Sequence, residues 1–291
     1  MKIMKKRRIC FVFLLILIVS AISGCATKKE DKVDVKEEKA TEIQVFIAAS
    51  LSNAMEEIKA LYAKKEPNVT ITYNADSSGT LLTQVQEGYE CDIFFSAAPK
   101  QMNTLESGGY LVEGTRKNVL NNQVVLITSK GSKTQVTGFD TMHLAKSMAL
   151  AGGSVPVGKY ARTILVNLGY LDMIEDSAVY TAEEVSRVLG GLEINECGNV
   201  SKVTEAVKEA ANEIGIVYYS DAYAVKDDVD IIAYADKELT GDIIYPVAQV
   251  ANTEADVSQT QAASDFLEFL DSEEAKAIFE KYMFLIYKED K

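Results

Sequence analysis

The stretch VFIAASLSNAM, residues 45–55, joins an apolar run to the start of a helical pattern. The run 43–49 has the composition of a buried strand, and Ala54 and Ile58 then recur at helical spacing. The joint contains Ser50 but no acid, base or cysteine. The stretch therefore predicts a β-strand that leads directly into an α-helix, which is the repeating unit of α/β folds.

Similar joints recur along the chain wherever an apolar run meets a helical pattern. Three more are predicted, at Ser77-Ser78, at Val157 and at Val200. Ligands of open α/β sheets bind beyond the carboxyl ends of the strands, where helices begin. The first N–H groups of a helix have no acceptor within the helix and carry a partial positive charge. Four helix starts directed at one point would therefore form a binding site for an anion.

Each of these residues also has an interpretation without a ligand. A serine before a helix is usually an N-cap, and this applies to Ser50. The pair Ser77-Ser78 followed by Gly79 favours a ligand more, because glycine lets the backbone approach a guest closely. Tyr218 ends an apolar run, where a tyrosine most often places its hydroxyl on a neighbouring backbone group. From the residues alone, both interpretations stay open.

Patterns of catalytic and metal sites are absent from the sequence. It contains no G-x-S-x-G, C-x-x-C, H-E-x-x-H or P-loop pattern. His143 is the single histidine, and because nothing beside it suggests a ligand or a base, we expect it at the surface. The sequence therefore predicts that the protein is not an enzyme, needs no cofactor and has no ligands for a metal cation.

The N-terminus has the features of an export signal. Five basic residues among the first eight precede an apolar run over 9–22, which is shorter than the ~20 residues that a membrane-spanning helix needs. The motif ISGC, residues 22–25, looks like a bacterial lipobox. We therefore expect a signal peptide over 1–24 and a protein held by lipid on Cys25 at the outer face of the cell membrane. Residues 25–41 are almost all charged or small, which predicts a flexible tether.

The chain is acidic, with 43 acidic and 30 basic residues and a formal net charge of −13. Loss of residues 1–24 would remove five basic residues and no acidic one, so the mature chain would carry −18. This charge argues against nucleic acid as a partner, because such a surface needs a basic footprint. It would not attract an anion either, so an anion site has to rely on local groups.

Five stretches, VFIAASLSNAM, DSSGTLLTQVQEG, CDIFFSA, SVPVGKYA and IGIVYYSDA, occur in the order and spacing of a known family. Over residues 42–288 the chain resembles the molybdate-binding proteins of ABC transporters. The resemblance implies a two-lobed, periplasmic-binding-protein-like (type II) α/β clamshell with a ligand cleft between the lobes. The first lobe would comprise 42–121 plus 248–291, and the second lobe 122–247.

The resemblance also implies a function. We expect an extracytoplasmic, monomeric receptor that captures molybdate or tungstate and delivers it to an ABC permease. Two alternatives stay open: a receptor for another tetrahedral oxyanion such as sulfate, and a surface-anchored sensor or interaction module.

The site residues are also implied by the resemblance. Ser50 and Ser78 would each offer a hydroxyl and an amide, Val157 and Val200 would offer backbone amides, and Tyr218 would offer its hydroxyl. The anion would thus be bound without a cationic side chain.

The sequence departs from the family pattern in two places. Gly79 stands where many members carry a serine, which makes Ser77 a candidate for an additional donor. Residues 181–199 look like an insertion, and within it Val185 competes with Val200 for the fourth amide. The spacing to Tyr218 favours Val200.

Cys91 and Cys197 remain in the body of the chain once Cys10 leaves with the signal peptide and Cys25 takes the lipid. In an exported protein they either form a disulfide or are separate buried thiols. The resemblance places them in different lobes, where a covalent bridge would hinder opening, and this favours free thiols.

Overall fold

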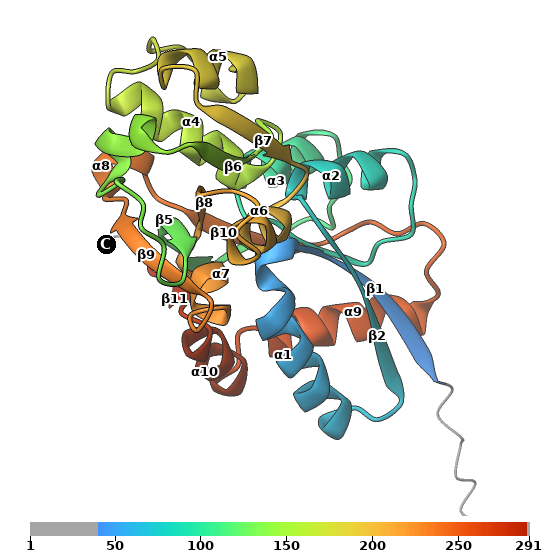
Figure 1. Ribbon diagram of the computed structural model, residues 1–291. Helices are drawn as coiled ribbons and strands as arrows, with labels where there is room; N and C mark the ends of the chain where they lie inside the picture. Colours follow the sequence, from blue (N-terminus) through green and yellow to red (C-terminus); the bar gives the residue numbers. More distant parts are fainter. Residues whose placement is uncertain (1–39, 290–291) are drawn as a thin grey trace, which may run out of the picture. The chain divides into compact units, whose positions relative to one another are not determined.

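The computed structural model describes residues 40–289, whose strands form two separate β-sheets accompanied by helices (Figure 1). The predicted signal peptide, the lipidation site Cys25 and nearly all of the tether lie outside the described residues. Helices and strands alternate along the described chain, so the prediction of an α/β fold is confirmed.

The first sheet combines strands from both ends of the described chain. Its order is β11-β4-β10-β3-β1-β2, in which β1 pairs in parallel with β2 and β3, whereas β10 and β11 run antiparallel to their neighbours. The strands are β1 (Thr41–Ala48), β2 (Val69–Asp76), β3 (Ile93–Phe95), β4 (Lys117–Asn121), β10 (Ile244–Gln249) and β11 (Leu285–Ile286).

Alternation along β1 gives this sheet a helical layer on each face. Val45 belongs to the core formed with α1, α9 and α10, and its neighbour Phe46 belongs to a second cluster with α2 and α3. Successive strand residues point to opposite faces, so both faces of the sheet are buried. The helices are α1 (Ser52–Lys65), α2 (Ser78–Gln86), α3 (Pro99–Ser107), α9 (Val257–Phe269) and α10 (Glu273–Lys281).

The second sheet is formed by one continuous part of the chain. Its order is β7-β6-β8-β5-β9, with β6 parallel to β7 and β8, and β5 antiparallel to β8 and β9. The strands are β5 (Val124–Ser129), β6 (Ser147–Ala151), β7 (Glu193–Cys197), β8 (Ile214–Tyr218) and β9 (Val229–Tyr234). The accompanying helices are α4 (Pro156–Asn167), α5 (Ala182–Val188), α6 (Val200–Lys208), α7 (Tyr219–Ala224) and α8 (Lys237–Thr240). Short 3₁₀ helices are η1 (Ala49–Leu51), η2 (Phe139–Leu144) and η3 (Ser177–Val179).

The chain passes from one sheet to the other twice, once through residues 122–123 and once through 235–243. The second crossing ends earlier than the predicted lobe boundary at 247/248. That boundary falls inside β10, whose whole length lies between β3 and β4 of the first sheet.

The segment that looks like an insertion, residues 181–199, contributes α5 and the edge strand β7, which pairs in parallel with β6. The apolar run that Tyr218 ends is β8, and α7 begins at the next residue, Tyr219.

The two cysteines of the described residues, Cys91 and Cys197, are buried free thiols, as the resemblance favoured. His143 is exposed, as expected. Among residues 40–289, no helix has the length and apolar character needed to cross a membrane.

Candidate functional site

A small cavity lies where four helix starts meet between the two sheets. All five residues predicted as ligands line it, namely Ser50, Ser78, Val157, Val200 and Tyr218. The cavity measures about 10 Å³, which is about the space that one water molecule needs. The structure thus brings the predicted set together, and the role of each residue in binding stays a prediction.

Four of the residues that line this cavity lie in the first turn of a helix. Ser50 lies in η1 directly after β1, and Ser78 is the first residue of α2. Val157 lies in the first turn of α4, and Val200 is the first residue of α6. N–H groups in a first turn have no acceptor within their own helix, and the helix dipole adds a partial positive charge there. The four elements therefore place N–H groups without an acceptor in their own helix beside one cavity.

Val200, and not Val185, provides the fourth helix start. Val185 is completely buried inside α5 and does not line the cavity. Val200 lines the cavity and is the first residue of α6. Asn199 is the N-cap of this helix, and its side chain accepts from the N–H of Lys202 at 3.1 Å. The Asn199 amide also donates to Asp76 Oδ1 at 3.0 Å and so connects the second sheet to the end of β2.

The two serines before α2 have different roles. Ser77 Oγ is the N-cap, accepting from the N–H of Thr80 at 3.1 Å. Ser78 Oγ accepts the N–H of Ala97 at 3.0 Å. Because a backbone N–H can only donate, the hydroxyl proton of Ser78 is free to point elsewhere. Ser77 Oγ has a second partner, Thr80 Oγ1 at 2.9 Å, whereas Ser78 is left arranged as a donor.

Ser50 is not an N-cap, since η1 begins after Ala48 and shows no side-chain cap. Its Oγ instead lies 3.0 Å from the hydroxyl of Tyr245, a fully buried residue of β10. The amide of Asn122 in turn donates to the same hydroxyl at 3.2 Å. Neither Asn122 nor Tyr245 was singled out from the sequence, because both stand in strand-like runs without a local signal.

Tyr218 places an unpaired hydroxyl at the cavity. The side chain is only 1% exposed, and its Oη has no hydrogen-bond partner among the described residues. Its ring lies between those of Tyr160 and Tyr245, with centroid distances of 6.3 and 5.7 Å. Burial raises the pKa of Tyr218 well above its ordinary value, so the group stays protonated. A buried hydroxyl without a partner costs free energy, and a guest that accepts its proton would remove that cost.

The lining contains no cation among the described residues, but it does contain one carboxylate. Asp76 ends β2, and its Oδ1 accepts both the N–H of Ser77 at 2.7 Å and the Asn199 amide. Within the described residues, no group of three or more His, Cys, Asp or Glu side chains could hold a metal ion.

Arg162 of α4 is buried near the site but does not line it. Its guanidinium donates to the carbonyls of Ala151 and Gly158 at 2.9 Å and of Tyr180 at 2.6 Å. These bonds tie the first turn of α4 to the end of β6. Arg162 thereby positions the amide of Val157.

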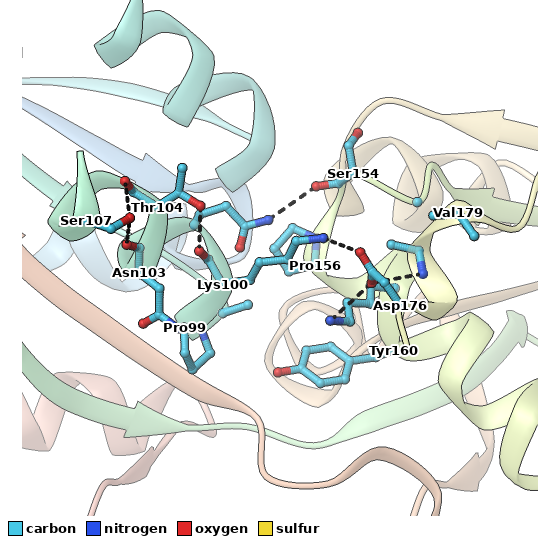
Figure 2. Close-up of a pocket in the computed structure, with 15 residues that line it drawn as sticks. Pro99, Lys100, Asn103, Thr104, Ser107, Ser154, Pro156, Tyr160, Asp176 and Val179 are labelled. Carbon is cyan, nitrogen blue, oxygen red and sulfur yellow. Dashed lines mark hydrogen bonds and ion pairs between the residues drawn. The ribbon is translucent and has the colours of Figure 1, made fainter. Parts of the chain in front are cut away.

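A larger cavity of about 690 Å³ adjoins the small one through Pro156, which lines both. Figure 2 shows that Lys100 from α3 reaches across it to Asp176, with 2.5 Å between the charged groups. Lys159 lies 3.4 Å from the same carboxylate. The elements of the two sheets thus face each other across a cleft that polar contacts bridge.

Gly79 lies against the backbone of Ser154. A Cβ built on Gly79 would lie 2.5 Å from the carbonyl oxygen of Ser154, closer than real Cβ contacts allow. The absence of a side chain at position 79 therefore permits the observed distance between α2 and the segment that precedes α4.

A buried carboxyl lies beside the tyrosines of the site. Asp221 of α7 has a buried Oδ2 without a hydrogen-bond partner among the described residues. Burial raises the pKa of Asp221 to about 7, although the N–H groups of Asp221 and Tyr218 act in the opposite direction. Its charge also contributes to the raised pKa values of Tyr218 and Tyr245.

Comparison with known proteins places this geometry in context. Residues 43–285 match the family described as bacterial extracellular solute-binding protein. Molybdate-binding protein ModA of Escherichia coli (strain K12) is 32% identical over 273 residues, covering 91% of this chain and 93% of that one. YvgL of Bacillus subtilis (strain 168), assigned as an ABC transporter substrate-binding lipoprotein, is 31% identical, covering 90% and 92% of the two chains.

A solved structure shares the fold as well. It is the substrate-binding domain assigned to a molybdenum ABC transporter of Clostridium difficile, with 31% identity and a TM-score of 0.60. The similarity covers 85% of this chain and all of that domain. The two-lobed, type II fold expected from the sequence is thereby confirmed.

The buried carboxyl leads to a prediction about pH. Because the folded state holds the Asp221 proton up to about pH 7 and the unfolded state releases it near pH 4, this group should lower stability as pH rises between those values. Asp221→Asn should remove this decline, which is on the order of a few kcal/mol. Urea unfolding at pH 5 and at pH 8 gives the free energy of unfolding at each pH, and the difference between the two values measures the decline. Asp227→Asn, at an exposed carboxylate of the same region, is the control, and equal pH dependence in both variants would contradict the assignment.

Proposed function

The chain belongs to the bacterial extracellular solute-binding proteins, and we propose that it captures molybdate or tungstate outside the cytoplasm and delivers the anion to an ABC permease. The observation that carries the proposal is the convergence of uncharged donors on one small cavity, among them the unpaired hydroxyl of Tyr218. Molybdate is the ligand named for the relative from Escherichia coli.

The energetics favour a fully deprotonated oxyanion. A hydrogen bond to a charged partner contributes about 1.5–3 kcal/mol, so several donors together bind an anion tightly. Helix starts add a positive potential that is strongest in a cavity shielded from water. The acidic net charge acts from farther away and is screened within about 8 Å at physiological salt. Local donors therefore outweigh it.

Size and hydrogen-bond direction would set the specificity. In a cavity of fixed size, the smaller sulfate would contact fewer donors at once. Ser78 Oγ already accepts the N–H of Ala97 and has a proton to give, so a protonated anion would meet it unfavourably. Asp76 is the exception in the lining, but its Oδ1 already accepts two hydrogen bonds.

Lipid anchoring and a monomeric state complete the proposal. Cys25 follows a signal-like segment, and the relative from Bacillus subtilis carries the description of a lipoprotein. A monomer on a tether of residues 25–41 would stay close to a permease in the same membrane. Its anion site would remain accessible from outside the cell.

Titration calorimetry tests the ligand. The purified protein should bind molybdate saturably at one anion per chain, with tungstate competing for the same site and sulfate binding far more weakly. A native mass spectrum of the protein as purified would report the mass of any anion that it carries. Strong heat with sulfate and none with molybdate would overturn the ligand assignment.

The hydroxyl of Ser78 should contribute strongly to binding. Ser78→Ala removes one hydrogen bond to a charged partner, so the dissociation constant for molybdate should rise roughly 10- to 100-fold. His143→Ala, at an exposed position in η2, should leave affinity unchanged. A large loss in the His143 variant, or none in the Ser78 variant, would place the site elsewhere.

The close approach at Gly79 should be required for tight binding. Gly79→Ala puts a Cβ against Ser154 and would hold the two sides of the cleft apart, so molybdate affinity should fall by at least tenfold. Gln86→Ala alters an exposed position of the same helix and should bind normally. Small-angle scattering with saturating molybdate should show a larger radius of gyration for the Gly79 variant than for the control. Identical affinities would show that the contact is not limiting.

A further inference from the structure

We propose that Asn122 and Tyr245 are positioning residues that fix Ser50 as a hydrogen-bond donor to the anion. The inference rests on the proposed function, because it assigns a direction to one donor of that site. It is carried by a chain of three hydrogen-bonding side chains that starts at the crossing between the sheets and ends at the cavity.

The orientation of the Asn122 amide is determined by its neighbours. Its Oδ1 accepts the N–H of Gln123 at 2.8 Å, and a backbone N–H can only donate. The Nδ2 group therefore faces the other way, where it donates to Ser220 Oγ at 2.9 Å and to Tyr245 Oη at 3.2 Å. Both protons of the amide are thus assigned to acceptors.

The direction then passes through Tyr245. Its hydroxyl accepts from Asn122 and lies 3.0 Å from Ser50 Oγ, a contact in which either oxygen can be the donor. Tyr245 is fully buried, so solvent does not take its proton, and we assign that proton to Ser50. Burial also raises the pKa of Tyr245 well above its ordinary value, so the proton is present at physiological pH.

Ser50 Oγ therefore accepts from Tyr245, and its own proton is left for the cavity that Ser50 lines. The same logic applies at Ser78, whose Oγ accepts the N–H of Ala97. A backbone amide orients one serine, and a side-chain relay orients the other. Because the relay begins in the two-residue crossing 122–123, it also ties this donor to the segment that joins the two sheets.

A double-mutant cycle tests the relay. Tyr245→Phe keeps the buried ring but removes the donor to Ser50, so the dissociation constant for molybdate should rise about tenfold. If Tyr245 acts through Ser50, the same change made in a Ser50→Ala protein should add no further loss. Asn122→Ala should give a smaller loss that also disappears in the Ser50→Ala protein.

Tyr73→Phe is the matched control, because it removes a hydroxyl that donates to the carbonyl of Met55 away from the cavity. Its molybdate affinity should equal that of the wild type. Urea unfolding without anion reports whether each variant is folded. The dissociation constants for molybdate are compared only at temperatures at which all variants are folded.

The outcomes separate the relay from the proposed function. If the wild type binds molybdate, but the losses from Tyr245→Phe and Ser50→Ala simply add, Tyr245 supports the fold generally and the relay is overturned. An unchanged molybdate affinity in the Tyr245→Phe variant would also overturn the relay. If the wild type binds no molybdate, the proposed function fails, and the relay fails with it.

Discussion

Buried hydrogen-bond donors need acceptors, and this requirement governs the centre of the molecule. Four helix starts and the hydroxyl of Tyr218 face one cavity in which the protein itself provides few acceptors. Each buried polar group without a partner costs about 1–3 kcal/mol. The fold carries this cost in its unliganded form, and an anion that accepts several protons would remove it. Binding and stability are thus linked, since a ligand that binds only the folded state stabilises it.

The donors are held by backbone and by short side chains, which makes the site rigid. Amides at helix starts cannot rotate away, and a serine loses little rotamer entropy when it is fixed. The close packing behind them has the same effect. A Cβ on Gly158 would lie 2.1 Å from the carbonyl of Gly152, so α4 can approach the end of β6 only because position 158 has no side chain. Long cationic side chains would bring charge but not this fixed geometry.

Local sequence patterns were sufficient for the elements and for most of the site. The joints at Ser50, Ser78 and Val157 are visible as apolar runs that meet helical spacing, and the structure places all three at the cavity. Tyr218 depended on the resemblance, because a tyrosine at a strand end has a simpler explanation. The contact between Ser50 and Tyr245 spans 195 residues and leaves no trace in either local segment. The elements within the apparent insertion 181–199 were left open, because its short runs fit a strand, a helix or a loop equally well.

The path of the chain between the sheets has a consequence for biogenesis. The second sheet comes from one uninterrupted segment and contains its own pairings, so it has what it needs to form as soon as that segment is available. The first sheet does not, because β10 is inserted between β3 and β4 and the last pairing waits for β11. Such distant pairings slow folding, since a long loop must close before they contribute. The first sheet would therefore remain incomplete until the C-terminal strands have been synthesised. This delay would give an export machinery time to translocate the chain while it is still unfolded.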